Sequence, residues 1–279
     1  MRIGVPKEIK NHEYRVGLVP GSVRELTDRG HEVVVETGAG LGAGLSDADY
    51  EAVGAKILPN AEAVFSSAEM IVKVKEPLAV ERARLSKGQV LFTYLHLAPD
   101  PEQTEDLVKS GATCIAYETV TSPIGTLPLL TPMSEVAGRM APQVGAACLE
   151  KERGGRGVLL GGVPGVPAAE VLVLGGGVAG TNATLIAVGM GANVTVVDRN
   201  LEALRRIAAQ FGNAVRTVYS TRDAIEHHAP YADLVIGTVL VPGAAAPKLV
   251  SAEIVRKMKP GAAIVDVAID QGGCCETSR

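Results

Sequence analysis

The sequence predicts an α/β protein built from two Rossmann-like, doubly wound parallel-sheet domains. Short apolar runs alternate with helical patterns along almost the whole chain, which is typical of parallel sheets covered by helices on both faces. A length of 279 residues allows two ordinary domains, and a hydrophobic content of 47% is enough for two cores. The formal net charge of −4 and the lack of a basic run argue against a nucleic-acid-binding protein.

The first half of the chain predicts one sheet and its helices. Strands are expected at 2–5, 31–36, 56–58, 69–74, 89–94 and 112–117. Helices are expected at 20–29, 61–67, 79–85 and 102–109. A further short helix is expected with Ser46 as its N-cap. A turn-rich segment at 120–131 then interrupts the pattern, and Thr131-Pro132 predicts the N-cap and first turn of a long helix over 133–151. We place the domain boundary here, with a substrate domain at 1–130 and a nucleotide-binding domain at 131–279.

Residues 171–198 predict a strand, a tight turn, a helix and a second strand. Gly175, Gly177 and Gly180 fit G-x-G-x-x-G, in which the glycines permit the turn, the approach of a pyrophosphate and close helix packing. Asp198 ends the second strand at about the 20-residue spacing of an acid that binds a ribose 2′-hydroxyl. A carboxylate there repels a 2′-phosphate, so the unit predicts NAD. The alternative is a similar sheet with an empty crevice.

The remaining pattern completes the second domain. Further helices are expected at 201–211, 221–228 and 251–258, and further strands at 214–218, 233–237 and 262–267. Two such domains with a cleft between them are a common arrangement in oxidoreductases, with ligands at the carboxyl ends of the strands.

Two basic residues of the first domain are candidates for holding a substrate. Arg15 lies in the loop after the first strand, and arginine can bind a carboxylate through two hydrogen bonds. Lys75 follows a strand in which Met70, Val72 and Val74 are expected to alternate inward. By spacing alone, the commoner interpretation of each residue is an ordinary surface charge.

Two further residues are candidates for proton transfer. His96 follows the strand at 89–94, where a side chain with a near-neutral pKa suits general acid–base catalysis. Asp270 follows the strand at 262–267 and precedes two glycines. The alternatives are that His96 is a buried structural histidine and that Asp266, inside the last strand, is the functional acid or a structural hydrogen-bonding group.

The four cysteines do not predict a metal site. Cys114, Cys148, Cys274 and Cys275 match no zinc or haem spacing, and their number is too low for a disulfide framework. Free thiols in a cytoplasmic protein are the expected state, and no metal is expected.

Several long motifs give the sequence a resemblance to a known family. They are IGVPKEIK at 3–10, RVGL at 15–18, VKVKEP at 72–77, LFTYLHLA at 91–98, LPLLTPMSEVAGRMAPQVGA at 127–146, GGRGVLLGGVPGV at 154–166, GGGVAGTNA at 175–183 and IVDVAIDQGG at 264–273. Together they resemble the family of alanine dehydrogenase and the nicotinamide-binding part of proton-translocating transhydrogenase. The resemblance implies NAD-dependent, reversible oxidative deamination of L-alanine to pyruvate and ammonia by a cytoplasmic homo-oligomer, expected to be a hexamer.

The resemblance also implies roles for individual residues. Arg15 and Lys75 would contact the substrate, while His96 would be the acid–base group with Asp270 as its partner. The implied cofactor contacts are Ser134, Gly175, Gly177, Val178, Ala179, Gly180, Asp198, Ser220, Val239, Leu240, Val267, Ala268, Ile269, Asp270 and Arg279.

The sequence departs from the family at two places. Ala203 stands where the family often carries a basic residue, so one contact to the adenosine half of NAD is expected to be absent. Family members continue beyond position 279 with a segment that lines the nicotinamide pocket and returns through the first domain. The 279-residue chain alone is therefore expected to bind NADH weakly and to turn over little. The alternatives are a transhydrogenase-like subunit that passes hydride to a partner protein and a truncated, non-catalytic dinucleotide-binding protein.

Overall fold

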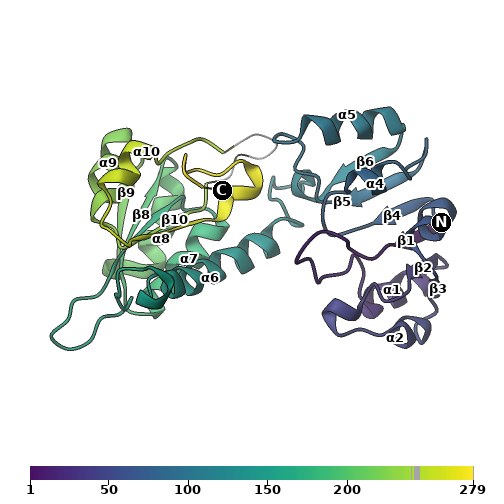
Figure 1. Cartoon of the computed structure of the whole chain (residues 1–279), viewed down its shortest axis with the longest axis horizontal. Coiled ribbons are helices and arrows are strands. Elements are labelled where there is room, and N and C mark those ends of the chain that lie inside the picture. Colours follow the sequence, from purple (N-terminus) through teal and green to yellow (C-terminus); the bar gives the residue numbers. More distant parts are fainter. Residues whose placement is uncertain (240, 242–245, 279) are drawn as a thin grey trace. The chain divides into compact units, whose positions relative to one another are not determined.

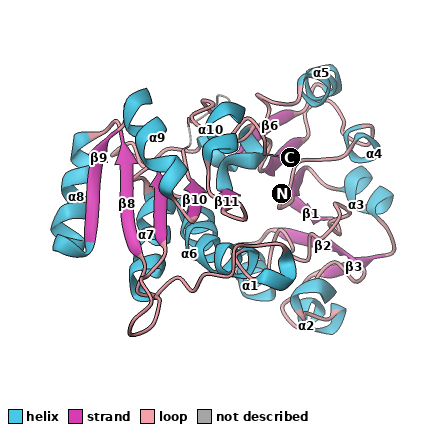
Figure 2. Ribbon diagram, turned by 60° about the vertical axis from the view of Figure 1, so that its left-hand side comes forward, coloured by secondary structure: helices cyan, strands magenta, loops and turns pink. Residues whose placement is uncertain are grey.

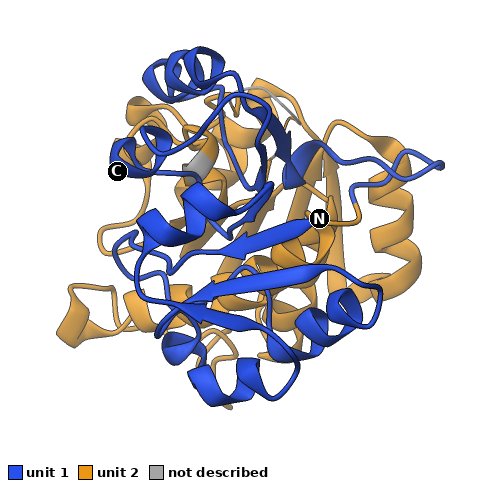
Figure 3. Ribbon diagram, turned by 90° about the vertical axis from the view of Figure 1, so that its right-hand side faces the viewer, with its two compact units in different colours: residues 1–127 blue, residues 128–279 orange. Residues whose placement is uncertain are grey.

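The computed structural model divides the chain into two compact units, Met1–Leu127 (unit 1) and Pro128–Arg279 (unit 2), coloured separately in Figure 3. It describes residues 1–239, 241 and 246–278, except for the side chain of Asp270. Both units are parallel α/β domains, which confirms the predicted fold class. Figure 1 labels many of their helices and strands.

Unit 1 contains a parallel sheet in the order β3-β2-β1-β4-β5-β6. The strands are β1 (Arg2–Val5), β2 (Glu32–Glu36), β3 (Lys56–Leu58), β4 (Met70–Val72), β5 (Val90–Thr93) and β6 (Thr113–Ala116). The helices are α1 (Pro20–Thr27), α2 (Asp47–Glu51), α3 (Ala61–Ser67), α4 (Ala79–Arg82) and α5 (Pro101–Ser110), with 3₁₀ turns η1 (Leu41–Ala43) and η2 (Tyr117–Thr119). The chain reverses its direction across the sheet between β1 and β4, so the loops after these strands meet at a topological switch point.

The described part of unit 2 contains a parallel sheet in the order β11-β10-β7-β8-β9. The strands are β7 (Glu170–Leu174), β8 (Asn193–Asp198), β9 (Val215–Tyr219), β10 (Leu234–Gly237) and β11 (Ala263–Asp266). The helices are α6 (Thr131–Cys148), α7 (Val178–Gly189), α8 (Leu201–Phe211), α9 (Arg222–His228) and α10 (Ala252–Lys257). The 3₁₀ turns are η3 (Lys151–Arg153), η4 (Gly212–Ala214), η5 (Ala229–Tyr231) and η6 (Val267–Gln271).

Each sheet has helices packed on both faces (Figure 2). In unit 2, residues of α6, α7 and α8 form the core on one face, and residues of α9 and α10 form the core on the other. In unit 1, α1 and α2 contribute to one core, and α3 and α5 to the second. Burial of apolar side chains on both faces is what a doubly wound parallel sheet requires.

Local sequence signals set several helix starts. Ser46 and Asp49 form a capping box at α2, as expected for Ser46 as N-cap. The side chain of Asn60 accepts a hydrogen bond from the Ala63 backbone at the start of α3, and Asn200 caps α8 in the same way.

Two local expectations are wrong. The long helix α6 begins at Thr131 itself, Leu130 is its N-cap residue, and no side chain caps it. The segment around β4 does not alternate between buried and half-exposed positions, because Ile71, Val72, Lys73 and Val74 are all buried. This strand lies between β1 and β5 in the sheet and is covered on both faces, which removes the period-2 pattern.

In the described part of the chain, no helix combines the length and the apolar character needed to span a membrane.

Candidate functional site

The glycine-rich turn after β7 has the geometry that the motif predicts. Gly175 has a φ of 105°, a conformation that strongly favours glycine. A Cβ atom at Gly180 would lie 1.8 Å from the Gly175 carbonyl oxygen, so α7 can pack against the turn only without a side chain there. A Cβ at Gly177 would meet no atom within 4 Å, which leaves open space beside the N-terminus of α7. The turn therefore fits a dinucleotide pyrophosphate at a helix start.

Thr238, at the end of β10, fixes this turn from the neighbouring strand. Its hydroxyl donates hydrogen bonds to the carbonyl oxygens of Leu174 (2.9 Å) and Gly175 (3.1 Å). Thr238 is buried, and it is a site residue that the sequence did not indicate. Because β7 and β10 flank the switch point of the unit 2 sheet, Thr238 holds the turn where a ligand is expected.

Asp198 ends β8 next to the glycine-rich turn. Its Oδ2 accepts a hydrogen bond from the Gly176 backbone (2.5 Å), and its Oδ1 accepts one from the Asn200 backbone (2.7 Å). These bonds fix a negative charge beside the turn, at the end of the strand adjacent to β7. The position fits recognition of a ribose hydroxyl and disfavours a 2′-phosphate.

The other expected cofactor residues come from several elements of unit 2. Ser134 lies in the first turns of α6, Val178 and Ala179 begin α7, Ser220 follows β9, and Val239 follows β10. Val267, Ala268 and Ile269 form the start of η6 after β11. Apart from Ser134, these residues follow the carboxyl ends of strands in the same sheet. Leu240, Arg279 and the side chain of Asp270 lie outside the described residues.

In unit 1, the expected substrate residues follow neighbouring strands. Arg15 lies in the loop after β1, Lys75 after β4 and His96 after β5, and these strands are adjacent in the order β1-β4-β5. Since parallel strands end at the same edge, the structure brings all three residues to one edge of the sheet. The hydroxyl of the buried Thr93 donates a 2.9 Å hydrogen bond to the Lys75 carbonyl, which ties the end of β5 to the Lys75 loop.

Arg15 is oriented by an acidic neighbour. Its Nε donates to Oε1 of Glu13 (2.7 Å), and its Nη2 donates to Oε2 (2.5 Å). The hydrogen bond from Arg15 is the main cause of the lowered pKa of Glu13, and the charge of Lys75 contributes in the same direction. The same hydrogen bond to Glu13 is the main cause of the raised pKa of Arg15.

A buried ion cluster connects the loops that carry Arg15 and Lys75. Lys73 is fully buried, and its Nζ lies 3.0 Å from Oε2 of Glu8 and 2.7 Å from Oε1 of Glu81. Glu8 also accepts a 2.7 Å hydrogen bond from the Val74 backbone. Burial raises the pKa of Glu8, although the charge of Lys73 acts in the opposite direction. The cluster fixes the loop after β1 to the segment that leads into Lys75.

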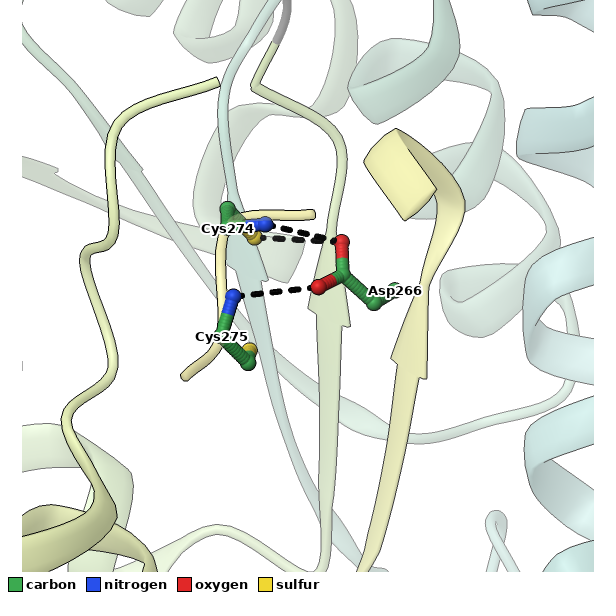
Figure 4. Close-up of side chains that lie close together, drawn as sticks. All are labelled: Asp266, Cys274 and Cys275. Atoms are coloured by element: carbon green, nitrogen blue, oxygen red, sulfur yellow. Dashed lines mark hydrogen bonds between the residues drawn. The ribbon is translucent and has the colours of Figure 1, made fainter. Parts of the chain in front are cut away.

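Unit 2 also contains a polar cluster, which consists of Asp266, Cys274 and Cys275 (Figure 4). The Asp266 carboxylate accepts hydrogen bonds from the backbones of Cys274 (3.2 Å) and Cys275 (3.0 Å) and from the hydroxyl of Ser278 (2.7 Å). The hydrogen bond with Cys275 and burial raise the pKa of the Cys274 thiol. Through these hydrogen bonds, Asp266 fastens the segment after η6.

Comparisons with known proteins agree with the geometry of both units. The N-terminal domain of the alanine dehydrogenase/PNT family matches residues 4–137, and its C-terminal domain matches residues 141–279. The chain is 58% identical over 279 residues to the alanine dehydrogenase of Halomonas elongata, covering 100% of this chain and 75% of the relative.

Two solved structures share both domains. An L-alanine dehydrogenase is 56% identical with a TM-score of 0.89, covering 99% of this chain and 76% of that protein. A transhydrogenase from Sinorhizobium meliloti is 30% identical with a TM-score of 0.83, covering 100% of this chain and 82% of that protein.

Proposed function

The chain belongs to the alanine dehydrogenase/PNT family, and from this premise we propose that it is an NAD-dependent L-alanine dehydrogenase. It converts L-alanine, NAD⁺ and water reversibly into pyruvate, ammonium, NADH and a proton. The observation that carries the proposal is the row of Arg15, Lys75 and His96 at adjacent strand ends of unit 1, in a chain 58% identical to a known alanine dehydrogenase.

The proposed chemistry divides between the two units. Unit 2 binds NAD through the glycine-rich turn and Asp198, and the cofactor supplies the hydride acceptor. In unit 1, Arg15 binds the substrate carboxylate and Lys75 contacts the oxygen or nitrogen at the reacting carbon. His96 transfers protons at that carbon as the carbonyl forms, and Asp270 of unit 2 is its proposed partner.

The function is tested by measuring NADH formation at 340 nm with protein produced from its complete reading frame. L-alanine and NAD⁺ together are expected to give NADH, and pyruvate with ammonia is expected to reoxidise it. The 30% identical transhydrogenase supports a second candidate, a subunit that binds NADH but passes hydride to another protein. Tight NADH binding without any alanine-dependent reduction would favour that candidate and contradict the proposed function.

Arg15→Ala is expected to weaken the binding of pyruvate while leaving NADH affinity unchanged. Loss of a charge-assisted hydrogen bond costs about 1.5–3 kcal/mol, so the Kd for pyruvate should rise at least about tenfold. Arg24→Ala removes an exposed arginine of α1 and serves as the control. Unchanged pyruvate affinity in Arg15→Ala would disprove the substrate role.

Asp198 is expected to set the preference for NAD over NADP. Asp198→Asn keeps one acceptor oxygen, for either the Gly176 or the Asn200 backbone N–H, and removes the charge that repels a 2′-phosphate. The kcat/KM for NAD⁺ divided by the kcat/KM for NADP⁺ should therefore fall in Asp198→Asn and fall further in Asp198→Ala. Equal use of both cofactors by the unmodified protein would refute this role and point to the neighbouring Arg199 as a phosphate contact.

We also propose that the protein works as a cytoplasmic homo-oligomer, with a hexamer as the expected size. Free thiols at all four cysteines favour a reducing compartment. Val136, Met140 and Val144 recur every four residues along α6 and are 54%, 53% and 42% exposed, which gives this helix an apolar stripe. Light scattering coupled to size exclusion measures the assembly directly.

A further inference from the structure

The backbone at His96 adopts a conformation that histidine rarely takes. Its φ is 49°, in the left-handed region, and among the described residues His12 is the one other non-glycine residue with a positive φ. Such a conformation persists only when the surrounding structure holds it in place. His96 lies in the segment directly after β5, so the contacts that hold it are those of the residues around the end of that strand.

Glu118 makes the contacts that hold this strand end. Its side chain is buried, with 6% of the residue exposed. Oε1 accepts hydrogen bonds from the backbone of His96 (2.7 Å) and of Leu95 (3.2 Å), and Oε2 accepts a second one from Leu95 (3.3 Å). Glu118 lies in η2, directly after β6, and Thr93 of β5 pairs with Ala116 of β6. The sheet register therefore places the carboxylate beside the peptide groups that precede His96.

The same peptide is held from its other side. The Gln103 side chain of α5 donates a 2.5 Å hydrogen bond to the Leu95 carbonyl, and Gln103 is 1% exposed. Glu118 thus accepts from the N–H groups of Leu95 and His96, while Gln103 donates to the carbonyl between them. These bonds leave little freedom for the backbone from which the imidazole projects.

The imidazole itself has no equivalent hydrogen bond at Nδ1. This atom is buried and has no hydrogen-bond partner among the described residues. The ring stacks on Tyr94, with centroids 5.9 Å apart and an interplanar angle of 6°. Its position therefore depends on the backbone and on this stacking contact.

We propose that Glu118 is a positioning residue for the acid–base group His96. The carboxylate acts as a buried acceptor that stabilises the left-handed backbone at His96 and so aims the imidazole at the reacting carbon. This inference rests on the proposed function, because it takes His96 as the proton-transfer group.

The test compares Glu118→Ala, Glu118→Gln and the control Glu105→Ala in protein produced from its complete reading frame. Glu105 is an exposed acid on α5 that pairs with Lys109, so its loss controls for a change of charge in the same unit. Glu118→Ala should lower kcat at least tenfold, whereas the KM for alanine and the Kd for NADH stay within about twofold. Glu118→Gln keeps an acceptor oxygen and should restore most of kcat. Glu105→Ala should match the unmodified protein.

A readout independent of activity is the NMR spectrum of the protein with ¹⁵N-labelled histidine rings. The His96 signal, assigned by its loss in His96→Ala, should shift in Glu118→Ala and stay near its original position in Glu118→Gln. If Glu118→Ala does not fold, the kcat and the His96 NMR signal of Glu118→Gln decide whether the inference holds.

Three results would overturn the inference. The first is a kcat of Glu118→Ala within twofold of that of the unmodified protein. The second is an equal loss of kcat in Glu118→Gln and Glu118→Ala. The third is an unchanged His96 NMR signal in Glu118→Ala. Failure of the proposed function is distinguishable, because the unmodified protein would then form no NADH from L-alanine and NAD⁺, whatever the effect of the Glu118 variants on the His96 NMR signal.

Discussion

His96→Ala is expected to lower alanine-dependent NADH formation by about 100- to 10,000-fold, the usual contribution of general acid–base catalysis. The substitution removes the imidazole that transfers protons at the reacting carbon. His96 belongs to unit 1 and the glycine-rich turn to unit 2, so NADH affinity, measured by fluorescence, should change little.

The control for this prediction is His227→Ala, which removes an exposed imidazole at the end of α9. It should leave kcat unchanged. Near-normal alanine oxidation by His96→Ala, with correct mass and NADH binding, would show that another group transfers the proton.

Lys73→Met is expected to cause the largest loss of stability. The ammonium of Lys73 neutralises Glu8 and Glu81 in a site where all three side chains are at most 2% exposed. Removing one partner from a buried ion cluster costs about 3–5 kcal/mol, because the remaining charges stay buried and unpaired. The free energy of unfolding of unit 1, measured in urea, should fall by that amount.

Two variants sharpen the test of Lys73. Lys257→Met breaks an exposed ion pair with Glu253 on α10 and should cost about 0.5 kcal/mol or less. Adding Glu8→Gln to Lys73→Met should recover part of the lost free energy of unfolding, because the buried charge of Glu8 is then removed. A decrease of less than about 1 kcal/mol in the free energy of unfolding of Lys73→Met would contradict this prediction. It would mean that water reaches the charged groups of the cluster in solution.

The sequence predicts the fold and the glycine-rich turn well because both depend on local patterns. The requirement for glycine at 175 and 180 arises within six residues, from a positive φ and a close helix approach. The alternation of apolar runs and helical segments likewise reflects nearby residues, and it predicted the elements of both sheets within a few positions.

The residues that support the site depend on long-range pairing and could not be predicted in the same way. Glu118 meets His96 only because β6 pairs with β5, and Lys73 finds Glu8 only because β4 pairs with β1. Lys73 directly follows β4, and its ammonium is buried between the carboxylates of Glu8 and Glu81. The hydrogen bonds that the Asp266 carboxylate accepts from Cys274, Cys275 and Ser278 are a further feature that the sequence did not indicate.

In the proposed reaction, bound NAD⁺ would accept hydride at nicotinamide C4 directly from the α-carbon of alanine. The most direct measurement uses L-alanine deuterated at the α-carbon and NAD⁺ in ordinary water, followed by mass spectrometry of the NADH formed. The proposed function predicts NADH carrying one deuterium at C4 and a slower initial rate where hydride transfer limits turnover. NADH without deuterium, or no NADH from protein that binds the cofactor, would contradict it.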